Sequence, residues 1–421
     1  MTTLAASLDQ SQRWRAVVAA SIGNALEWFD FVVYGFFAVT MAKLFFPTGN
    51  ETVSLLVTLA SFGVPYFMRP LGAIVLGSYA DTHGRKAALM LTIGLMMAGT
   101  AVIAVAPTFA SIGLLAPILV VSARMVQGFS AGGEFGSATA FLAEQNPQRR
   151  GFFASWQFAS QGLTTILATA FGATLAATLT TEQMESWGWR IPFIFGLLIG
   201  PVAYYIRRHL DETMEFQATQ TSKAPLREVL ADGKARLLVA LGTVVLSTVA
   251  TYTVLFMPTY ATRNLGLPAS GSYLASLLTG AIQLALIPVV GAFTDRHGRL
   301  PIGCAAATAM LLAVYPMFAW LAAVPTLQTL LIVQAIIGVL AACYLGGLPA
   351  LMSELFPTRM RTTGLAISYS LGVMAFGSFA PFINASLIEV TGSKLAPSFY
   401  LMLAAAISLA ALLAARRLGM R

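Results

Sequence analysis

Several charged side chains lie inside long apolar stretches of this sequence, where a charge is costly. On membrane-insertion scales a charge at the centre of an apolar span costs roughly 3 kcal/mol, so it is normally paired, exposed to water or functional. Glu27 and Asp30 are three residues apart, which places both carboxylates on one face of a helix. A carboxylate in apolar surroundings is a plausible proton carrier, so we predict that Asp30 or Glu27 carries a proton.

Arg124 lies in another apolar stretch and is the natural partner of this carboxylate pair. The proton, the arginine and an anionic substrate would then compete for the same charges. The alternative is a permanent ion pair that fixes the register of two helices.

Two further charges inside apolar stretches have two interpretations each. Arg69 either binds a carboxylate of the substrate or braces its helix near Pro70 and Gly72. Glu134 follows a glycine pair and is a third candidate for proton coupling, with helix packing or gating as the alternative.

Uncharged polar residues in the apolar stretches are weaker candidates for contact with a substrate. For each of them alone, hydrogen bonding between helices is the other interpretation. The candidates are Asn24, Tyr34, Gln157, Gln161, Tyr252, Tyr369 and Asn384.

The composition indicates which elements must position these residues. The chain has 421 residues, of which 57% are hydrophobic and 10% charged, with a mean hydropathy of +0.77. A membrane-spanning helix needs roughly 20 apolar residues, and the sequence holds about twelve such runs. We therefore predict an all-α integral membrane protein. The spans are predicted at about 16–41, 53–79, 87–106, 111–142, 152–179, 189–206, 237–261, 271–294, 301–322, 326–352, 363–389 and 397–415.

The spans divide into two halves that repeat one another. Between residues 207 and 236 the apolar signal stops and charges of both signs alternate. A polar hinge at residues 77–86 recurs at 291–300 with its small residue, Asp, His, Gly and Arg in matching places. Repeats of this kind are typical of transporters. We predict an N-terminal bundle of six helices at 1–206, a central cytoplasmic loop at 207–236 and a C-terminal bundle of six helices at 237–421.

The basic residues predict the orientation in the membrane. If the N-terminus is inside, only Lys43, Arg190, Arg263 and Lys394 face outward, and the other loop arginines and lysines face the cytoplasm. This asymmetry follows the positive-inside rule. Both termini are therefore expected in the cytoplasm.

Other classes of protein do not fit the sequence. The net charge of +8 is scattered over loops, which excludes a nucleic-acid surface. Cys304 and Cys343 lie in apolar runs without ligand spacing, so neither a metal site nor a disulfide is expected. Residues 128–132 match an esterase motif but lie inside an apolar helix rather than a strand–turn–helix, so no enzyme is predicted.

Several motifs together resemble the major facilitator superfamily and, within it, the metabolite:proton symporters. They are the repeated hinge, residues 23–31, the Arg-Pro-Leu-Gly at 69–72, residues 124–134, the Trp-Arg-Ile-Pro-Phe at 189–193 and residues 354–359. Residues 67–77 and 391–394 are most similar to bacterial citrate and tricarballylate carriers.

The resemblance implies two pseudo-symmetric six-helix bundles in a bacterial inner membrane. It implies import of a small organic anion together with a proton, without another cofactor and by a monomer. The alternatives are symport of 2-oxoglutarate, shikimate, betaine or proline, export of amphipathic compounds, and a membrane sensor that does not transport.

The resemblance also implies that the hinges lock one conformation by pairing with charged helix ends. Arg149 or Arg150 is the expected partner of Asp81, whereas the second hinge ends in Leu300 rather than a basic residue. The gating residues implied are Asp81, Arg85, Arg149, Asp295 and Arg299.

Overall fold

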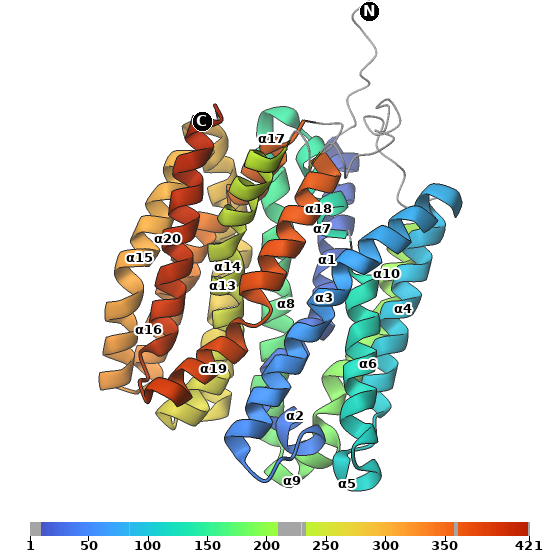
Figure 1. Ribbon diagram of the computed structural model, residues 1–421, viewed down its shortest axis with the longest axis vertical. Coiled ribbons are helices and arrows are strands. Elements are labelled where there is room, and N and C mark those ends of the chain that lie inside the picture. The colour runs from blue at the N-terminus through green and yellow to red at the C-terminus, as the bar shows by residue number, and fades with distance from the viewer. Residues whose placement is uncertain are drawn as a thin grey trace, which may run out of the picture.

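The predicted all-α fold is confirmed in the computed structural model. The structure describes residues 10–83, 85–132, 134–208, 229, 233–357 and 361–419, and these contain helices and no strand. Each predicted span corresponds to one helix or to a helix with a break (Figure 1).

The first half begins with a bent span and ends with α10. A 67° bend separates α1 from α2 at Phe37. The helices are α1 (Gln10–Phe36), α2 (Ala38–Phe45), α3 (Glu51–His83), α4 (Arg85–Val105), α5 (Phe109–Ile112), α6 (Leu115–Ser130), α7 (Glu134–Glu144), α8 (Arg150–Thr178), α9 (Thr181–Gln183) and α10 (Arg190–Arg208).

The second half has two interrupted spans. Glycines 346 and 347 separate α16 from α17, and a π-helical stretch (Val373–Gly377) follows α18; a proline near the start of α17 and of α19 suits the first turn of a new helix. The helices are α13 (Lys234–Leu265), α14 (Ala269–His297), α15 (Arg299–Ala323), α16 (Leu327–Leu345), α17 (Leu348–Leu355), α18 (Arg361–Gly372), α19 (Ala380–Thr391) and α20 (Ala396–Arg417).

Not every span is apolar enough to be recognised by hydropathy alone. By length and composition, 7 helices in the described residues can cross a membrane, or up to 8 if the bent pair counts as one span. The other spans are α4, α6 with α7, α8 and α10. On α8, buried amides and hydroxyls such as Gln157, Ser160 and Gln161 lower the hydropathy.

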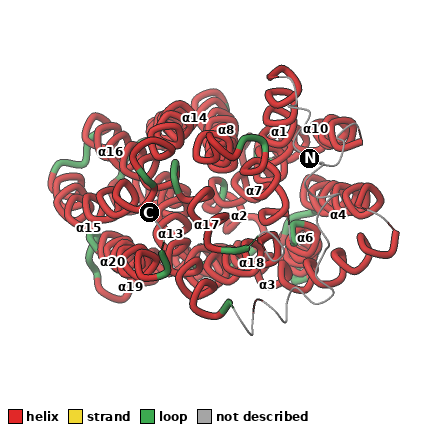
Figure 2. The backbone as a smooth tube through the Cα atoms, turned by 90° about the horizontal axis from the view of Figure 1, so that it is seen from above, coloured by secondary structure: helices red, strands yellow, loops and turns green. Residues whose placement is uncertain are grey.

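The two halves lie side by side and meet along two seams. Viewed from above, α8 lies against α14 along one seam, and α3 lies near α18 along the other (Figure 2). At the first seam a Cβ atom on Gly162 would lie 2.8 Å from the carbonyl oxygen of Gly280, and one on Gly291 would lie 2.6 Å from that of Gly151. Backbone therefore packs directly on backbone, which small residues permit in membrane helices.

The two ends of the bundle are named here by their loops. The hinge face carries the end of α14, the start of α15 and the C-terminus, and the opposite face carries α2, α5 and α9 (Figure 1). The bundle boundaries at 206/207 and 236/237 stay a prediction, because most of the residues between them lie outside the described part.

Candidate functional site

Among the described charged side chains of the first half, Arg124 is the most enclosed. Its side chain on α6 is 0% exposed, and its guanidinium carbon lies 4.8 Å from the ring centre of Phe31 and 4.6 Å from that of Tyr34. Cation–π attraction to these faces partly replaces the lost hydration of the cation. Its Nε and Nη2 atoms are buried without a hydrogen-bond partner among the described residues. Two donors of one guanidinium therefore stay available for an acceptor.

Asp30 is connected to Arg124 through two uncharged side chains. Arg124 Nη1 donates to Gln127 Oε1 at 3.1 Å, and Gln127 Nε2 donates to Thr100 Oγ1 at 3.0 Å. The Thr100 hydroxyl in turn donates to Asp30 Oδ2. Among the ion pairs of the described residues none joins Asp30 to Arg124, so the direct partnership expected from the sequence is not present in this conformation. A hydrogen-bonded relay across α6, α4 and α1 takes its place.

Asp30 and Glu27 lie on the same face of α1. Asp30 is 5% exposed, and its Oδ1 atom has no hydrogen-bond partner among the described residues. Glu27 lies one turn earlier on α1 and is partly buried. Two of the three predicted proton carriers, Asp30 and Glu27, therefore lie on one face of α1 in the first half.

Arg69 lies on α3 inside an aromatic box. Its guanidinium carbon is 4.9 Å from the ring centre of Trp28, 5.3 Å from Phe31 and 4.6 Å from Tyr66. The Phe31 ring is thus shared with Arg124. Both sequence interpretations of Arg69 remain open, because the box holds the cation in place and also brings it next to the Arg124 site.

Asn24 and Gln157 are hydrogen-bonded to one another across α1 and α8. Asn24 Nδ2 donates to the backbone carbonyl of Gln157 at 3.1 Å and to Ser160 Oγ at 2.7 Å, and Gln157 Nε2 donates to Asn24 Oδ1 at 3.0 Å. These contacts match the interhelical interpretation. By contrast, the buried Nε2 atom of Gln161, one turn along α8, has no hydrogen-bond partner in the described part.

Two of the predicted site residues in the second half, both tyrosines, reach the first half. Tyr252 on α13 donates a hydrogen bond of 2.5 Å to the hydroxyl of Tyr66 on α3. Tyr369 on α18 stacks on Phe135 of α7, with ring centres 3.4 Å apart. Tyr252 therefore connects the second half to the aromatic box around Arg69.

The remaining polar candidates are bonded within their own half. Tyr34 shares a hydrogen bond of 2.6 Å with Ser61. Asn384 is 0% exposed and donates to Thr253 at 3.5 Å, while its Oδ1 atom has no partner among the described residues.

The second hinge lies across the interface at the hinge face. Asp295 accepts hydrogen bonds from the backbone amides of Gly151 at 2.7 Å and Phe152 at 3.0 Å, in the first turn of α8. These amides have no partner within their own helix, and the helix dipole favours a carboxylate there. Asp295 also accepts from Arg299 at 3.2 Å. The hinge of the second half thus caps a helix of the first half.

Four further charged residues extend this contact. Glu354 pairs with Arg299 at 2.8 Å and with Arg150 at 3.5 Å, and Arg361 pairs with Glu144 at 3.3 Å. Arg150 and Glu144 belong to the first half and their partners to the second. Arg149 takes no part in these pairs; its guanidinium carbon lies 5.0 Å from the ring centre of Phe152.

The halves are also connected at the opposite face. Arg263 on α13 pairs with Glu51 on α3 at 3.2 Å, and Tyr273 on α14 donates to the Phe36 carbonyl at 2.8 Å. In this conformation the two halves are therefore bonded at both ends of the bundle.

Some predicted residues lie outside the described side chains, and some contacting residues were not predicted. The side chains of Asp81, Arg85 and Glu134 belong to the part that is not described. Thr100 and Glu354 were missed as site residues. Gln127 was missed too, although its spacing of three residues from Arg124 places it on the same helix face and could have identified it.

A metal-dependent site finds no support in the described part of the chain. No group of three or more His, Cys, Asp or Glu side chains there could hold a metal ion. Cys304 and Cys343 are free and partly buried.

Comparisons with known proteins agree over nearly the whole chain. Family models match residues 16–240, described as "Sugar (and other) transporter", and residues 239–419, described as "Major Facilitator Superfamily". A citrate-proton symporter of Klebsiella pneumoniae is 39% identical over 93% of this chain and 89% of its own. An alpha-ketoglutarate permease of Escherichia coli is 33% identical over 98% and 96%, and a proline/betaine transporter of Salmonella typhimurium is 34% identical over 96% and 83%. A solved proton:xylose symporter shares the fold with a TM-score of 0.76 at 15% identity, covering 96% of this chain and 95% of that one.

Proposed function

The chain belongs to the major facilitator superfamily, and on that premise we propose that it is a proton-coupled symporter that imports citrate or another di- or tricarboxylate. The observation that carries this proposal is the buried Arg124, which keeps two unpartnered donors and is connected to Asp30 by hydrogen bonds. An arginine with two free donors matches the fork of a carboxylate. The identity to citrate-proton symporters supports the substrate class.

Substrate binding is assigned to both halves. Arg124 binds one carboxylate, and Arg69 binds a second from the neighbouring aromatic box. Tyr252, Tyr369 and Asn384 contribute hydroxyl and amide groups from the second half. Tyr34 and Gln161 line the same region, whereas Asn24 and Gln157 hold α1 against α8.

Proton coupling is assigned to Asp30 and the relay. An ionised Asp30 accepts a hydrogen bond from the Thr100 hydroxyl. Thr100 in turn accepts from the amide of Gln127, whose oxygen accepts from Nη1 of Arg124. A proton on Asp30 weakens this chain of bonds and frees Arg124 for the anion. Glu27 is the alternative carrier one turn away, and Glu134 is a third candidate.

The charged contacts at the hinge face are assigned to gating. Alternating access requires that one face opens while the other closes, with the substrate bound between the halves. Asp295, Arg299, Arg150 and Glu354 hold the hinge face closed in this arrangement. Asp81 and Arg85 are proposed to act in the same way from the first hinge.

The positive-inside rule supports a cytoplasmic hinge face. Both termini would then be cytoplasmic in a bacterial inner membrane. The proton is the only coupling ion proposed, and the monomer is the functional unit.

Other metabolites are the second candidate substrates. The names of relatives favour 2-oxoglutarate, proline and betaine, and shikimate is a further member of this group. A membrane sensor that does not transport is the remaining alternative.

Uptake of radiolabelled citrate into proteoliposomes with an imposed pH gradient tests the proposal. We expect uptake that collapses with a protonophore and is competed by tricarballylate. Absence of citrate uptake together with gradient-driven uptake of 2-oxoglutarate or proline would move the assignment to that substrate. Citrate uptake that is unchanged by the protonophore would contradict proton coupling.

A further inference from the structure

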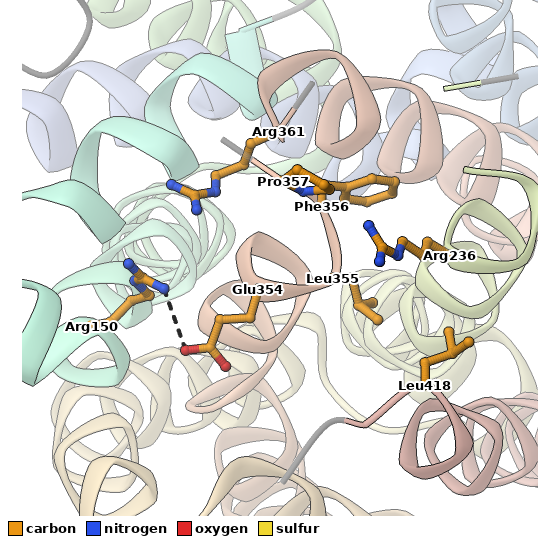
Figure 3. Close-up of a pocket in the computed structure, with 8 residues that line it drawn as sticks. All are labelled: Arg150, Arg236, Glu354, Leu355, Phe356, Pro357, Arg361 and Leu418. Atoms are coloured by element: carbon orange, nitrogen blue, oxygen red, sulfur yellow. Dashed lines mark ion pairs between the residues drawn. The ribbon is translucent and has the colours of Figure 1, made fainter. Parts of the chain in front are cut away.

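A pocket of about 320 Å³ opens at the hinge face between the two halves. Three arginines reach it from three helices: Arg150 from α8, Arg236 from α13 and Arg361 from α18 (Figure 3). Among the described residues of its lining Glu354 is the single carboxylate, and Phe356 and Leu418 are part of its apolar wall. The lining therefore carries more positive than negative charge.

The ion pairs around the pocket leave part of this positive charge uncompensated. Arg299, which lies outside the lining, holds both oxygens of Glu354, at 2.8 Å and 2.9 Å, whereas Arg150 lies at the longer distance of 3.5 Å. The Nε atom of Arg150 is buried without a hydrogen-bond partner in the described part. Glu354 can therefore stay on Arg299 while Arg150 turns to another acceptor.

The other two arginines differ from one another. Arg361 pairs with Glu144 at 3.3 Å and donates through Nε to the Ser353 carbonyl at 2.9 Å. Arg236 has neither an ion pair nor a hydrogen bond to any side chain among the described residues, and it is exposed. Arg150 and Arg236 are thus the two guanidinium groups able to accept a new partner.

We propose that this pocket binds a small anion that carries two or more negative charges, through phosphate or carboxylate groups held between Arg150 and Arg236. Guanidinium groups bind such oxygens in pairs, with charge-assisted hydrogen bonds. The volume lies at the lower end for ligand pockets, which suits a compact anion rather than a nucleotide.

Because the pocket lies between the two halves, an anion bound there affects how the halves are arranged. Arg150 belongs to the first half and Arg236 to the second, so an anion between them bridges the halves. A ligand that binds only one arrangement stabilises that arrangement. Together with the function proposed above, this means that the anion slows turnover by keeping the hinge face closed.

Binding is tested first, without transport. The purified full chain is reconstituted in phosphatidylcholine nanodiscs, and binding of radiolabelled pyrophosphate is measured at constant ionic strength. We expect saturable binding at one site, weakened about 10-fold in Arg236→Gln. Lys234→Gln is the matched control, because Lys234 is also exposed at the start of α13 but does not line the pocket. An equal loss in both variants, or unsaturable binding, would overturn the proposal.

Nanodiscs that contain cardiolipin, whose headgroup carries two phosphate groups, separate the two sources of the anion. Binding of pyrophosphate in both lipids supports a free anion as the ligand. Loss of pyrophosphate binding in the wild type when cardiolipin is present supports a lipid headgroup in the same pocket. Absence of binding in both lipids overturns the proposal, provided that gel filtration shows a folded monodisperse protein.

The effect on turnover is tested in proteoliposomes loaded with pyrophosphate. We expect citrate counterflow to fall about threefold in the wild type and to be unaffected in Arg236→Gln. Equal slowing of both proteins contradicts the regulatory part. If the wild type does not transport citrate at all, the proposed function fails, while the nanodisc measurement still decides whether the pocket binds an anion.

Discussion

The two halves share a helical plan but contribute different chemistry to their interface. In the first half Asp30, Arg69 and Arg124 are buried within the span region, each at most 5% exposed. In the second half the described charged side chains lie near helix ends, and the groups that reach the first half beside the buried arginines are Tyr252 and Tyr369. Within the span region charge is therefore concentrated in the first repeat, and the second repeat supplies hydroxyl groups and aromatic surface there, while its charges contact the first half only at the two ends of the bundle.

This difference separates two tasks that a coupled transporter must perform. The hydrogen-bond relay from Asp30, the proposed proton carrier, to Arg124 lies entirely within the first half. The second half can respond through the hydrogen bond between Tyr252 and Tyr66, which ends beside Arg69. The comparison thus predicts that substitutions in the first half reduce transport more than substitutions in the second half.

The largest loss is expected for Arg124→Gln. Removal of the buried guanidinium leaves the substrate carboxylate without its charged donors, so citrate counterflow should fall roughly 100-fold or more. Arg124→Lys keeps the charge without the fork and should give an intermediate rate. If the counterflow rate of Arg124→Gln stays within threefold of the wild-type rate, the predicted difference between the two halves is contradicted.

Asp30→Asn should separate exchange from accumulation. An amide cannot carry the proton, so gradient-driven accumulation of citrate should be lost while counterflow continues. Both are measured in the same proteoliposomes, with Glu27→Gln as the matched variant. If both variants still accumulate citrate against its gradient, neither carboxylate of α1 is the proton carrier.

Thr100→Val tests the relay between the proton and the arginine. Loss of the hydroxyl interrupts the chain of hydrogen bonds, and we expect gradient-driven uptake to fall roughly 10-fold, with a smaller change in counterflow. Thr100→Ser restores the hydroxyl and should restore coupling. Equal losses in both assays would indicate a packing defect instead.

The smallest effect is expected from the second half. Tyr252→Phe removes one hydrogen bond between the halves, which corresponds to roughly a threefold fall in uptake rate. Tyr66→Phe removes the same bond from the other side and should give a similar fall. A loss for Tyr252→Phe as large as that for Arg124→Gln would show that the second half contributes more than the comparison predicts.

The charged part of the site could be predicted because burying a charge in an apolar run is costly. Asp30 and Arg124 are recognisable in the sequence for that reason. Gln127 could have been identified only by its spacing from Arg124, and Thr100 could not be identified at all, since its role depends on hydrogen bonds to Asp30 of α1 and Gln127 of α6. A direct contact between Asp30 and Arg124 is not present in this conformation, and spacing along a helix cannot predict the distance between side chains of two helices.

The contacts of the second hinge could be predicted only in part for the same reason. Its repetition could be seen in the sequence, and so could Asp295 and Arg299 as charged residues. That Asp295 would cap α8 of the other half depends on the docking of α14 against α8, which no local pattern encodes. The residues of the spans were predicted well because length and apolarity are local properties, whereas the breaks at Phe37 and at residues 346–347 emerged only from the structure.

The glycine contacts between α8 and α14 have a mechanical consequence. Interlocked side chains resist sliding, because each must leave its groove and adopt a new rotamer before the next position is reached. Where backbone packs on backbone, as at Gly162 and Gly280, no side chain has to change its rotamer when the helices slide past one another. Friction along this seam should therefore be low, and the speed of rocking should be set by the charged contacts at the two ends of the molecule.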